Sequence, residues 1–396
     1  MRMRSRTQRS AIGIVILLFS ASMFAAAQTP LRDLSRVRYP RIEGLGGAHP
    51  TLIGDLSVVQ TNPAGLRSDD TTTQFATLGA NVTGPVFSLA SLLISAADDP
   101  ADVLESDEAL DFLRNITAIS DTAGPIGFGY TGGGVGYSVH NALGTSLTAP
   151  RSGTLRYTVS QRLVFRGGYA FPLPMPEGSA MNLDAGLLVS AFIQGESGDE
   201  FPLIEVADVF DDIGPGLVLD APFALRSGFG LNLGLLWSYA DTVAVGLVGE
   251  NVYAPAVETE YESVTAFVDS EGPVSGRTTY LLSPEVHLGA RYSVGLGALG
   301  RYIDEVDLYA SYFDAFDFLT RDNPRNPLIK FAVGSEIRLL EIMRLRLAFS
   351  EGLPSAGFGL RLGVVDVNGA VYGRELSSEP GLRSVYNVGF SIDIRR

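Results

Sequence analysis

Few side chains in this sequence have the types and spacing that active-site chemistry requires. The chain has 396 residues, no cysteine and three histidines, which excludes disulfides, thiol catalysis and cysteine-ligated zinc. Residues 127–132 fit the pattern G-x-G-x-x-G, but a dinucleotide site needs a helix to start there, and another glycine-rich, strand-like stretch follows. We interpret His140 as a lumen or loop histidine. We therefore expect no enzyme activity, no catalytic residue, no metal site and no cofactor.

The composition limits the class of protein further. Hydrophobic residues make up 46% of the chain, glycine occurs 45 times, and the formal net charge is −15. This hydrophobicity excludes a disordered chain. The acidic balance argues against a nucleic-acid partner, because binding to phosphates needs a basic surface.

The N-terminus has the pattern of a secretory signal peptide. Four arginines lie within residues 2–9, an apolar run covers residues 11–24, and three alanines follow at residues 25–27. The apolar run is too short to span a bilayer as a helix. We expect residues 1–27 to be a cleaved signal peptide, residues 28–70 to be an N-terminal hatch or plug segment, and residues 71–396 to be an outer-membrane β-barrel.

Alternation of apolar and polar residues recurs through the body of the chain. In residues 286–294 the apolar positions Val286, Leu288 and Tyr292 alternate with His287, Gly289 and Arg291. Such a period of two predicts strands with one apolar and one polar face. About fourteen strands are expected, near residues 72–82, 124–131, 134–141, 154–171, 180–194, 226–239, 242–252, 280–292, 303–315, 328–340, 343–350, 355–365, 367–375 and 385–395. Residues 196–202, 256–278 and 320–327 are expected to be long loops, and residues 99–117 and 203–213 to be helical.

Alternation is compatible with a soluble sandwich and with a membrane barrel. Three features favour an all-β transmembrane antiparallel barrel: the signal peptide, a polar face rich in glycine and charge, and an apolar face almost free of charge over the length of a tilted membrane strand. An exported chain without spanning helices can cross a membrane only as a closed barrel. The expected location is the bacterial outer membrane, with its lipid bilayer as a partner.

The segment before the first expected strand carries a distinctive motif. It contains Gly44, Leu45, Gly46 and Ala48, then Asp55, then the run Asn62, Pro63, Ala64, Gly65 and Leu66. Pro63 restricts Asn62 to extended geometry, so the segment is suited to fixed turns packed inside something. A glycine element, an acidic position and an NPA run before a barrel resemble the FadL/OmpP1/TodX outer-membrane transporters, and the PorV-like relatives begin similarly.

The resemblance implies an N-terminal hatch that plugs the lumen. It also implies passive uptake of a hydrophobic small-molecule ligand, of the long-chain fatty acid or hydrocarbon type, through a lateral opening in the wall. A PorV-like scaffold for envelope protein partners is the alternative. A general porin is a weaker third hypothesis, because the residues before the first strand would obstruct its lumen.

Two further sets of residues follow from the transport hypothesis. A side exit requires a local loss of strand pairing, which glycines favour, so Gly132, Gly133 and Gly134 are a candidate kink in the wall, with a plain hairpin turn as the alternative. If the ligand is a carboxylate, Arg151, Arg156 or Arg162 could pair with its head group. The alternative for these arginines is pairing with acidic residues of the lumen.

Overall fold

The computed structural model describes residues 38–68, 71–85, 112–114, 116–149, 153–176, 178–206, 209, 214–240, 242–296, 302–320 and 323–396. The expected signal peptide, residues 28–37 of the expected plug, Arg151 and most of the expected helix at 99–117 lie outside these ranges. Among the described residues, no helix is long and apolar enough to cross a membrane.

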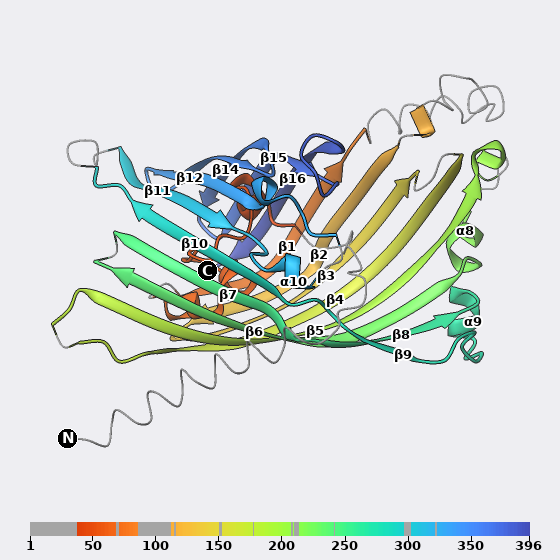
Figure 1. Ribbon diagram of the computed structural model, residues 1–396, viewed down its shortest axis with the longest axis horizontal. Helices are drawn as coiled ribbons and strands as arrows, with labels where there is room; N and C mark the ends of the chain where they lie inside the picture. Colours follow the sequence, from red (N-terminus) through yellow and green to blue (C-terminus); the bar gives the residue numbers. More distant parts are fainter. Residues whose placement is uncertain are drawn as a thin grey trace, which may run out of the picture.

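The described strands form one closed antiparallel ring (Figure 1). The first strand, β1, pairs with the last, β16, and β5 pairs with β6 to close the circle. The strands are β1 (Thr72–Thr83), β2 (Thr117–Gly132), β3 (Val135–Thr148), β4 (Thr154–Pro172), β5 (Met181–Pro202), β6 (Phe223–Tyr239), β7 (Val243–Tyr253), β8 (Pro255–Tyr261), β9 (Thr278–Leu281), β10 (Glu285–Ser293), β11 (Ile303–Tyr312), β12 (Phe331–Leu339), β13 (Met343–Ser350), β14 (Leu353–Leu362), β15 (Val365–Glu375) and β16 (Ser384–Arg395).

These sixteen elements occupy fourteen positions in the wall. The strand β8 continues β7 along the same neighbour, β6, after a break at Ala254, and β9 leads into β10 after a similar short break. Asn251, just before the first break, has a positive φ of 50°. The expected all-β fold class and the fourteen strands are therefore confirmed.

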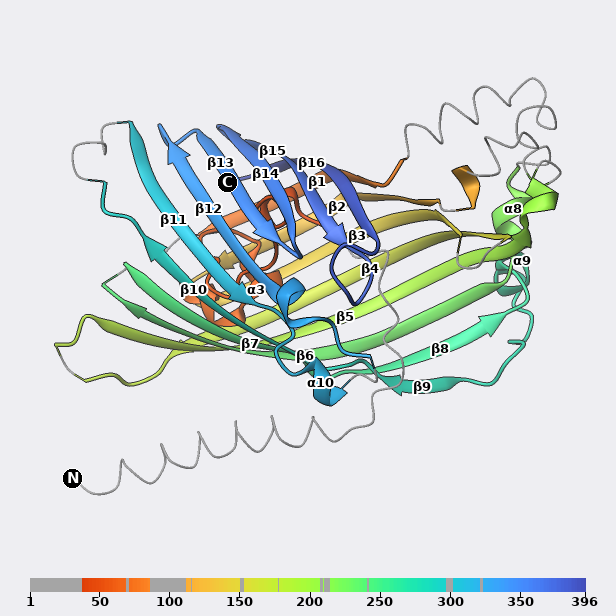
Figure 2. The same ribbon diagram turned by 45° about the horizontal axis from the view of Figure 1, so that its top comes forward.

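The two ends of the barrel differ in the length of their connections. At the end that holds the start of β1 and the end of β16, short turns join β2 to β3, β12 to β13 and β14 to β15, while most of the connections at the other end are long. The strands β4, β5 and β6 are also much longer than β12 and β13 and extend past them (Figures 1 and 2). We call the part formed by β3–β9 the tall wall and the part formed by β11–β16 the short wall.

Two segments of the tall wall that were expected to be loops are strands. Residues 196–202 belong to β5 and pair with β4, and residues 256–261 belong to β8 and pair with β6. Their acidic, proline- and glycine-containing sequences resemble loops, but backbone pairing with a long neighbour keeps them extended. Of the expected helix at 203–213, the structure describes a 3₁₀ turn, η2 (Leu203–Glu205).

The side chains of the wall alternate as a membrane barrel requires. Large apolar residues are exposed on the outer face of strands around the ring; examples are Leu78, Phe165, Val189, Phe229, Leu288, Leu308, Leu347, Phe358, Val371 and Val388. Polar residues on the same strands are buried inside, among them Thr77, Ser160, Gln194, His287, Asp307, Glu336, Asn368 and Ser391. A core of apolar side chains packed together would show the reverse burial. The chain is a transmembrane β-barrel whose apolar face meets lipid.

Residues 38–68 lie inside the barrel (Figure 2). They contain α2 (Pro40–Gly44), α3 (Val58–Thr61) and a 3₁₀ helix, η1 (Pro63–Arg67). Helix α2 contacts β13–β16, whereas η1 contacts β2–β6. We call residues 38–68 the plug. The remaining helices of the described residues are short: α8 (Gly216–Leu219), α9 (Val264–Val268), α10 (Asp317–Thr320) and η4 (Pro327–Lys330).

Candidate functional site: the plug and its junction with the wall

The inner wall is lined with glycines where the plug touches it. A Cβ on Gly334 would lie 2.5 Å from the Leu45 carbonyl oxygen, and a Cβ on Gly246 would lie 2.5 Å from that of Pro50. The same close approach occurs between further wall glycines and plug residues: Gly129 with Leu56, Gly136 with Leu66, Gly186 with Pro63, Gly234 with Asn62, Gly289 with Pro50 and Gly357 with Gly44. At Gly186, Gly246 and Gly334 the close atoms belong to the plug backbone, so a side chain there would push the plug away, and these glycines fix where it sits.

The run Asn62–Pro63–Ala64 fastens one side of the plug. The Asn62 side-chain amide donates to the carbonyls of Pro50, at 2.7 Å, and Leu235, at 3.1 Å. Its oxygen accepts from the backbone N–H of Ala64 at 3.0 Å, which caps η1. One buried side chain therefore joins two parts of the plug to β6.

The glycine element fastens the opposite side. Gly46 and Gly47 have φ angles of 80° and 133°, which glycine adopts without steric cost. They turn the chain so that His49 is fully buried, with Nε2 donating to the Leu45 carbonyl and Nδ1 accepting from the Ser311 hydroxyl, each at 2.6 Å. Burial lowers the pKa of His49 to about 4, with the hydrogen bond to Leu45 acting in the opposite sense.

Asp55 is the centre of a buried ionic network between plug and wall. Its carboxylate accepts from Arg41 of the plug at 2.6 Å and from Arg395 of β16 at 3.3 Å. Arg41 also reaches Glu336 of β12, at 3.1 Å, which pairs with the fully buried Arg346 at 2.6 Å. Burial alone would raise the pKa of Asp55, but the facing arginines, foremost Arg41, hold it well below its usual range. Arg41 is held charged in turn, because Asp55 and Glu336 raise its pKa despite burial.

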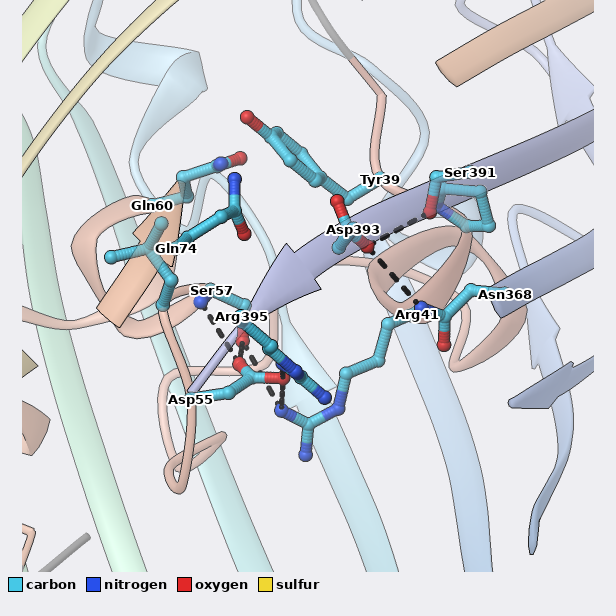
Figure 3. Close-up of a pocket in the computed structure, with 12 residues that line it drawn as sticks. Tyr39, Arg41, Asp55, Ser57, Gln60, Gln74, Asn368, Ser391, Asp393 and Arg395 are labelled. Carbon is cyan, nitrogen blue, oxygen red and sulfur yellow. Dashed lines mark hydrogen bonds and ion pairs between the residues drawn. The ribbon is translucent and has the colours of Figure 1, made fainter. Parts of the chain in front are cut away.

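A small polar cavity lies beside this network, between the plug and β1, β15 and β16 (Figure 3). Tyr39, Asp55 and Gln60 line it from the plug, and Gln74 and Asp393 line it from the wall. Its volume of about 30 Å³ has room for about two water molecules. The lumen is therefore filled by the plug here, with space for polar occupants at the edge.

The wall is irregular next to this cavity. Between β1 and β2, regular pairing ends at Gln74–Gly129 and resumes at Gly79–Ala123. Between β2 and β3, residues 124–126 stand opposite Asn141 alone. Gly124 has a φ of 95°, so residues 124–126 form a bulge. We call this part of β1, β2 and β3 the wall interruption.

Two side-chain amides replace the lost backbone pairing. The Gln74 amide donates to the Gly127 carbonyl at 2.9 Å, and the Asn141 side-chain oxygen accepts from the Ile126 backbone N–H at 3.0 Å. The outer face of the interruption carries the exposed apolar side chains Phe75, Leu78, Ile126 and Phe128. The wall interruption is therefore apolar toward lipid, and polar toward the plug.

Gly132, Gly133 and Gly134, the candidate kink, do not coincide with the irregular part of the wall. Gly132 pairs with Val135, and Gly133 and Gly134, with φ angles of 62° and 85°, form the two-residue turn between β2 and β3. These residues are the hairpin turn, and the irregularity lies eight residues earlier in β2, at Gly124. A glycine followed by proline at 124–125 was the available signal, because proline has no N–H for a ladder.

Two of the three candidate head-group arginines have partners in the tall wall. Arg156 pairs with Glu200 of β5 at 2.6 Å. The Arg162 guanidinium lies 4.8 Å from the centre of the Phe192 ring. Arg151 lies outside the described residues. The structure thus places Arg156 and Arg162 on one inner face, apart from the plug motif.

One group in the described chain has metal-ligand types close together. The ligand atoms of Glu250, Glu285 and His287 lie within 4.8 Å of one another. However, the backbone N–H of Asp314 donates to Nδ1 of His287 at 3.1 Å. The neutral ring then carries its proton on Nε2, which points at the two carboxylates and offers no lone pair to a cation. This arrangement favours hydrogen bonding over metal binding.

Comparison with known proteins adds likeness in fold. No protein-family model matches this chain, and no curated protein matches it. Solved structures similar to it include the CymD monoaromatic hydrocarbon channel (12% identity, TM-score 0.43, covering 90% of this chain and 96% of that one). Others are a Pseudomonas aeruginosa FadL homologue (10%, 0.42, 89% and 97%) and the Pseudomonas putida toluene transporter TodX (12%, 0.39, 94% and 98%).

FadL and TodX also name the transporter family that the N-terminal motif resembles. The identities and TM-scores are low, so the likeness carries no information on what this chain binds. The plug, its glycine-lined seat and the wall interruption rest on the described residues themselves.

Proposed function

We propose that this chain is an outer-membrane β-barrel transporter that takes up hydrophobic small molecules without energy input. The observation that carries the proposal is the wall interruption, which lies beside a seated plug and is flanked by Phe75, Leu78, Ile126 and Phe128 on the lipid side. A ligand of the long-chain fatty acid or hydrocarbon type gains roughly 0.8 kcal/mol per CH₂ on leaving water for hydrocarbon. Sideways passage into lipid is therefore favoured over passage along a polar lumen.

In this mechanism the plug blocks the straight route and the wall supplies the exit. The glycine-lined seat and the Asp55 network hold the plug in the lumen. The amides of Gln74 and Asn141 close the wall interruption at rest, with two hydrogen bonds in place of a ladder. Breaking two side-chain hydrogen bonds costs on the order of 1–3 kcal/mol, so thermal opening is accessible.

An uptake experiment tests this proposal. The gene is expressed in a Gram-negative host that lacks its own channel for hydrophobic compounds, and uptake of radiolabelled dodecane, dodecanoate and dodecan-1-ol is measured against the empty vector. We expect faster uptake of at least one of these compounds and unchanged uptake of a hydrophilic trisaccharide. Equal rates with and without the gene for all three compounds would contradict the proposal.

A PorV-like docking scaffold for envelope protein partners is a second candidate function. The observation that favours it is the tall wall, whose connections carry the exposed apolar residues Ile204, Val268 and Val274. A scaffold would retain its partner after the wall interruption is sealed, whereas a transporter would lose uptake. Replacing these three residues with serine should abolish a scaffold's complexes in a detergent pull-down and leave a transporter's uptake unchanged.

A further inference from the structure

Two buried side chains of opposite charge, Arg38 and Asp121, lie within electrostatic reach of each other inside the barrel. Arg38 begins the described part of the plug and is 7% exposed, and Asp121 of β2 is 3% exposed. Among the described residues, Nε and Nη1 of Arg38 and both carboxylate oxygens of Asp121 have no hydrogen-bond partner. Leaving such groups buried and unpaired is costly, so something polar is expected between them.

The surroundings place these two groups at one level of the lumen. Asn81 of β1 lies directly opposite Asp121 in the register, and its side-chain amide donates to the Arg38 carbonyl at 2.9 Å. The Arg38 guanidinium lies near Tyr372, and the Tyr372 hydroxyl donates to the Asn81 side-chain oxygen at 3.4 Å. Asp121 is within electrostatic reach of Arg38. Asn81, Asp121 and Tyr372 therefore all lie close to Arg38.

Arg38 and Asp121 lie next to the wall interruption. Asp121 lies two residues before Ala123, the last residue of β2 to pair regularly before the bulge. Tyr39, the neighbour of Arg38, lines the small polar cavity together with Gln74, which closes the interruption. A ligand leaving through the interruption would therefore pass with one end beside Arg38 and Asp121.

The charges of Arg38, Asp121 and their neighbours determine which polar end of a ligand can bind between them. The second arginine nearby, Arg374, is already paired with Glu43 at 3.2 Å, so Arg38 and Asp121 balance each other. A carboxylate would place a negative charge beside Asp121, and an ammonium group would place a positive charge beside Arg38. An uncharged group that accepts from Arg38 and donates to Asp121 satisfies both.

We propose that Arg38 and Asp121 form a head-group site for hydrophobic ligands with an uncharged group that both donates and accepts hydrogen bonds, such as an alcohol or a primary amide. This inference rests on the proposed uptake of hydrophobic small molecules, and among these it changes the preferred ligand from a fatty acid or hydrocarbon to an uncharged amphiphile. The site discriminates against plain hydrocarbons, which leave both charges unpaired, and against ionised carboxylates.

Binding of four ligands with the same chain length tests the site. The protein is reconstituted in nanodiscs at pH 7.5, and equilibrium binding of radiolabelled dodecan-1-ol, dodecanoate, dodecylammonium and dodecane is measured with empty nanodiscs subtracted. We expect dodecan-1-ol to bind about tenfold more tightly than each of the others, the value of one hydrogen-bonded charge.

Two variants and a matched control make the test specific. Arg38→Met/Asp121→Leu keeps the net charge and should abolish the preference for dodecan-1-ol. Asp121→Asn leaves Arg38 uncompensated and should shift the preference to dodecanoate. The control Glu305→Gln/Arg338→Met removes a partly exposed ion pair of β11 and β12 and should keep the wild-type preference. Faster migration of unheated than of heated samples in SDS gel electrophoresis confirms that each barrel is folded.

The remaining outcomes separate the inference from the proposed function. Equal binding of all four ligands to the wild type would mean that only water bridges Arg38 and Asp121 and would overturn the inference alone. So would a preference for dodecan-1-ol that survives in Arg38→Met/Asp121→Leu. Binding of none of the four would contradict the proposed function as well.

Discussion

At the scale of single residues, the plug is held by a few side chains that each make several contacts. Asn62 joins Pro50, Ala64 and β6, and Asp55 joins Arg41 to Arg395. Each of these groups is buried, so removing one leaves its partners without water to replace it. Small changes at these positions should therefore loosen the whole plug.

The substitution Asn62→Ala should destabilise the plug. Three hydrogen bonds disappear and two buried carbonyls lose a donor, which we expect to cost about 2–3 kcal/mol. Hydrogen exchange of residues 38–68, followed by mass spectrometry, should show faster exchange in the folded barrel. Arg67→Ala, which removes a half-exposed ion pair with Asp184, is the control and should leave the exchange unchanged. Equal exchange in wild type and Asn62→Ala would contradict the structural role of Asn62.

The plug should also loosen in mild acid because of His49. Its pKa falls from an unfolded value of about 6.5 to about 4 when it is buried neutral. The unfolded segment binds the extra proton between these values, so stability is full above pH 6.5 and declines as the pH falls toward 4, by about 3 kcal/mol in all.

Asp55 acts in a different window. Its pKa is depressed, so its contribution is present above the unfolded value near 4 and is lost only at still lower pH. Hydrogen exchange of the plug between pH 7 and 4.5, divided by the intrinsic amide exchange rate at each pH, should accelerate as the pH falls in the wild type and stay constant in His49→Gln. Parallel acceleration in both proteins would show that another group is responsible.

At the scale of secondary-structure elements, the inner face of the wall is shaped to receive the plug. Strands on nearly opposite sides of the ring each carry a glycine against which the plug packs: Gly234 of β6 lies against Asn62 and Pro63, and Gly357 of β14 lies against Gly44. These glycines cost strand stability, and their position is explained only by the neighbouring chain. The inner face of the wall strands is therefore complementary in shape to the plug.

The substitution Gly234→Val should unseat the plug. A Cβ there would collide with Asn62 Oδ1 and the Pro63 ring, and overpacking of this kind costs about 1–3 kcal/mol. The barrel itself should still form, since valine favours strands. In planar bilayers the variant should conduct ions, whereas the wild type should remain nearly closed. Gly167→Val, where a Cβ would meet only the Phe165 ring, is the control and should stay closed; conductance equal to that of the wild type in Gly234→Val would contradict the seat.

Much of this architecture could be predicted from the sequence. Alternation over residues such as Val286–Tyr292 gave the membrane strands in the right order, because the lipid-facing side chains must be apolar throughout. Strand residues that extend beyond the membrane need no apolar lipid-facing side chains. Residues 196–202 of β5 and 256–261 of β8 therefore lack the alternation and were expected to be loops.

The site was less predictable. The motif from Gly44 to Leu66 indicated a packed segment, but nothing in one sequence says which wall glycines face it. The three glycines at 132–134 were more conspicuous than Gly124, although the latter marks the wall interruption. Arg38 and Asp121 carry no local signal, because their unpaired atoms exist only once the plug meets β2.

At the scale of the whole molecule, the plug is held firmly in the lumen, and the wall interruption is the part of the barrel that we expect to open. The plug contacts strands on both sides of the ring, whereas the wall interruption is held by the amides of Gln74 and Asn141. The absence of cysteine from the sequence allows each part to be locked separately. A Cβ on Gly79 of β1 would lie 3.5 Å from the Cβ of Ala123 of β2, and a Cβ on Gly44 of the plug would lie 3.5 Å from that of Ala370 of β15. Both separations are within the range for a disulfide.

The most direct test of the account compares these two locks. Gly79→Cys/Ala123→Cys links β1 to β2 at the edge of the wall interruption, and Gly44→Cys/Ala370→Cys links the plug to β15. Uptake of radiolabelled dodecan-1-ol is measured in cells under oxidising conditions and again after reduction. We predict that the wall lock abolishes uptake reversibly and that the plug lock leaves it unchanged; uptake that persists through the locked wall and stops with the locked plug would contradict the account.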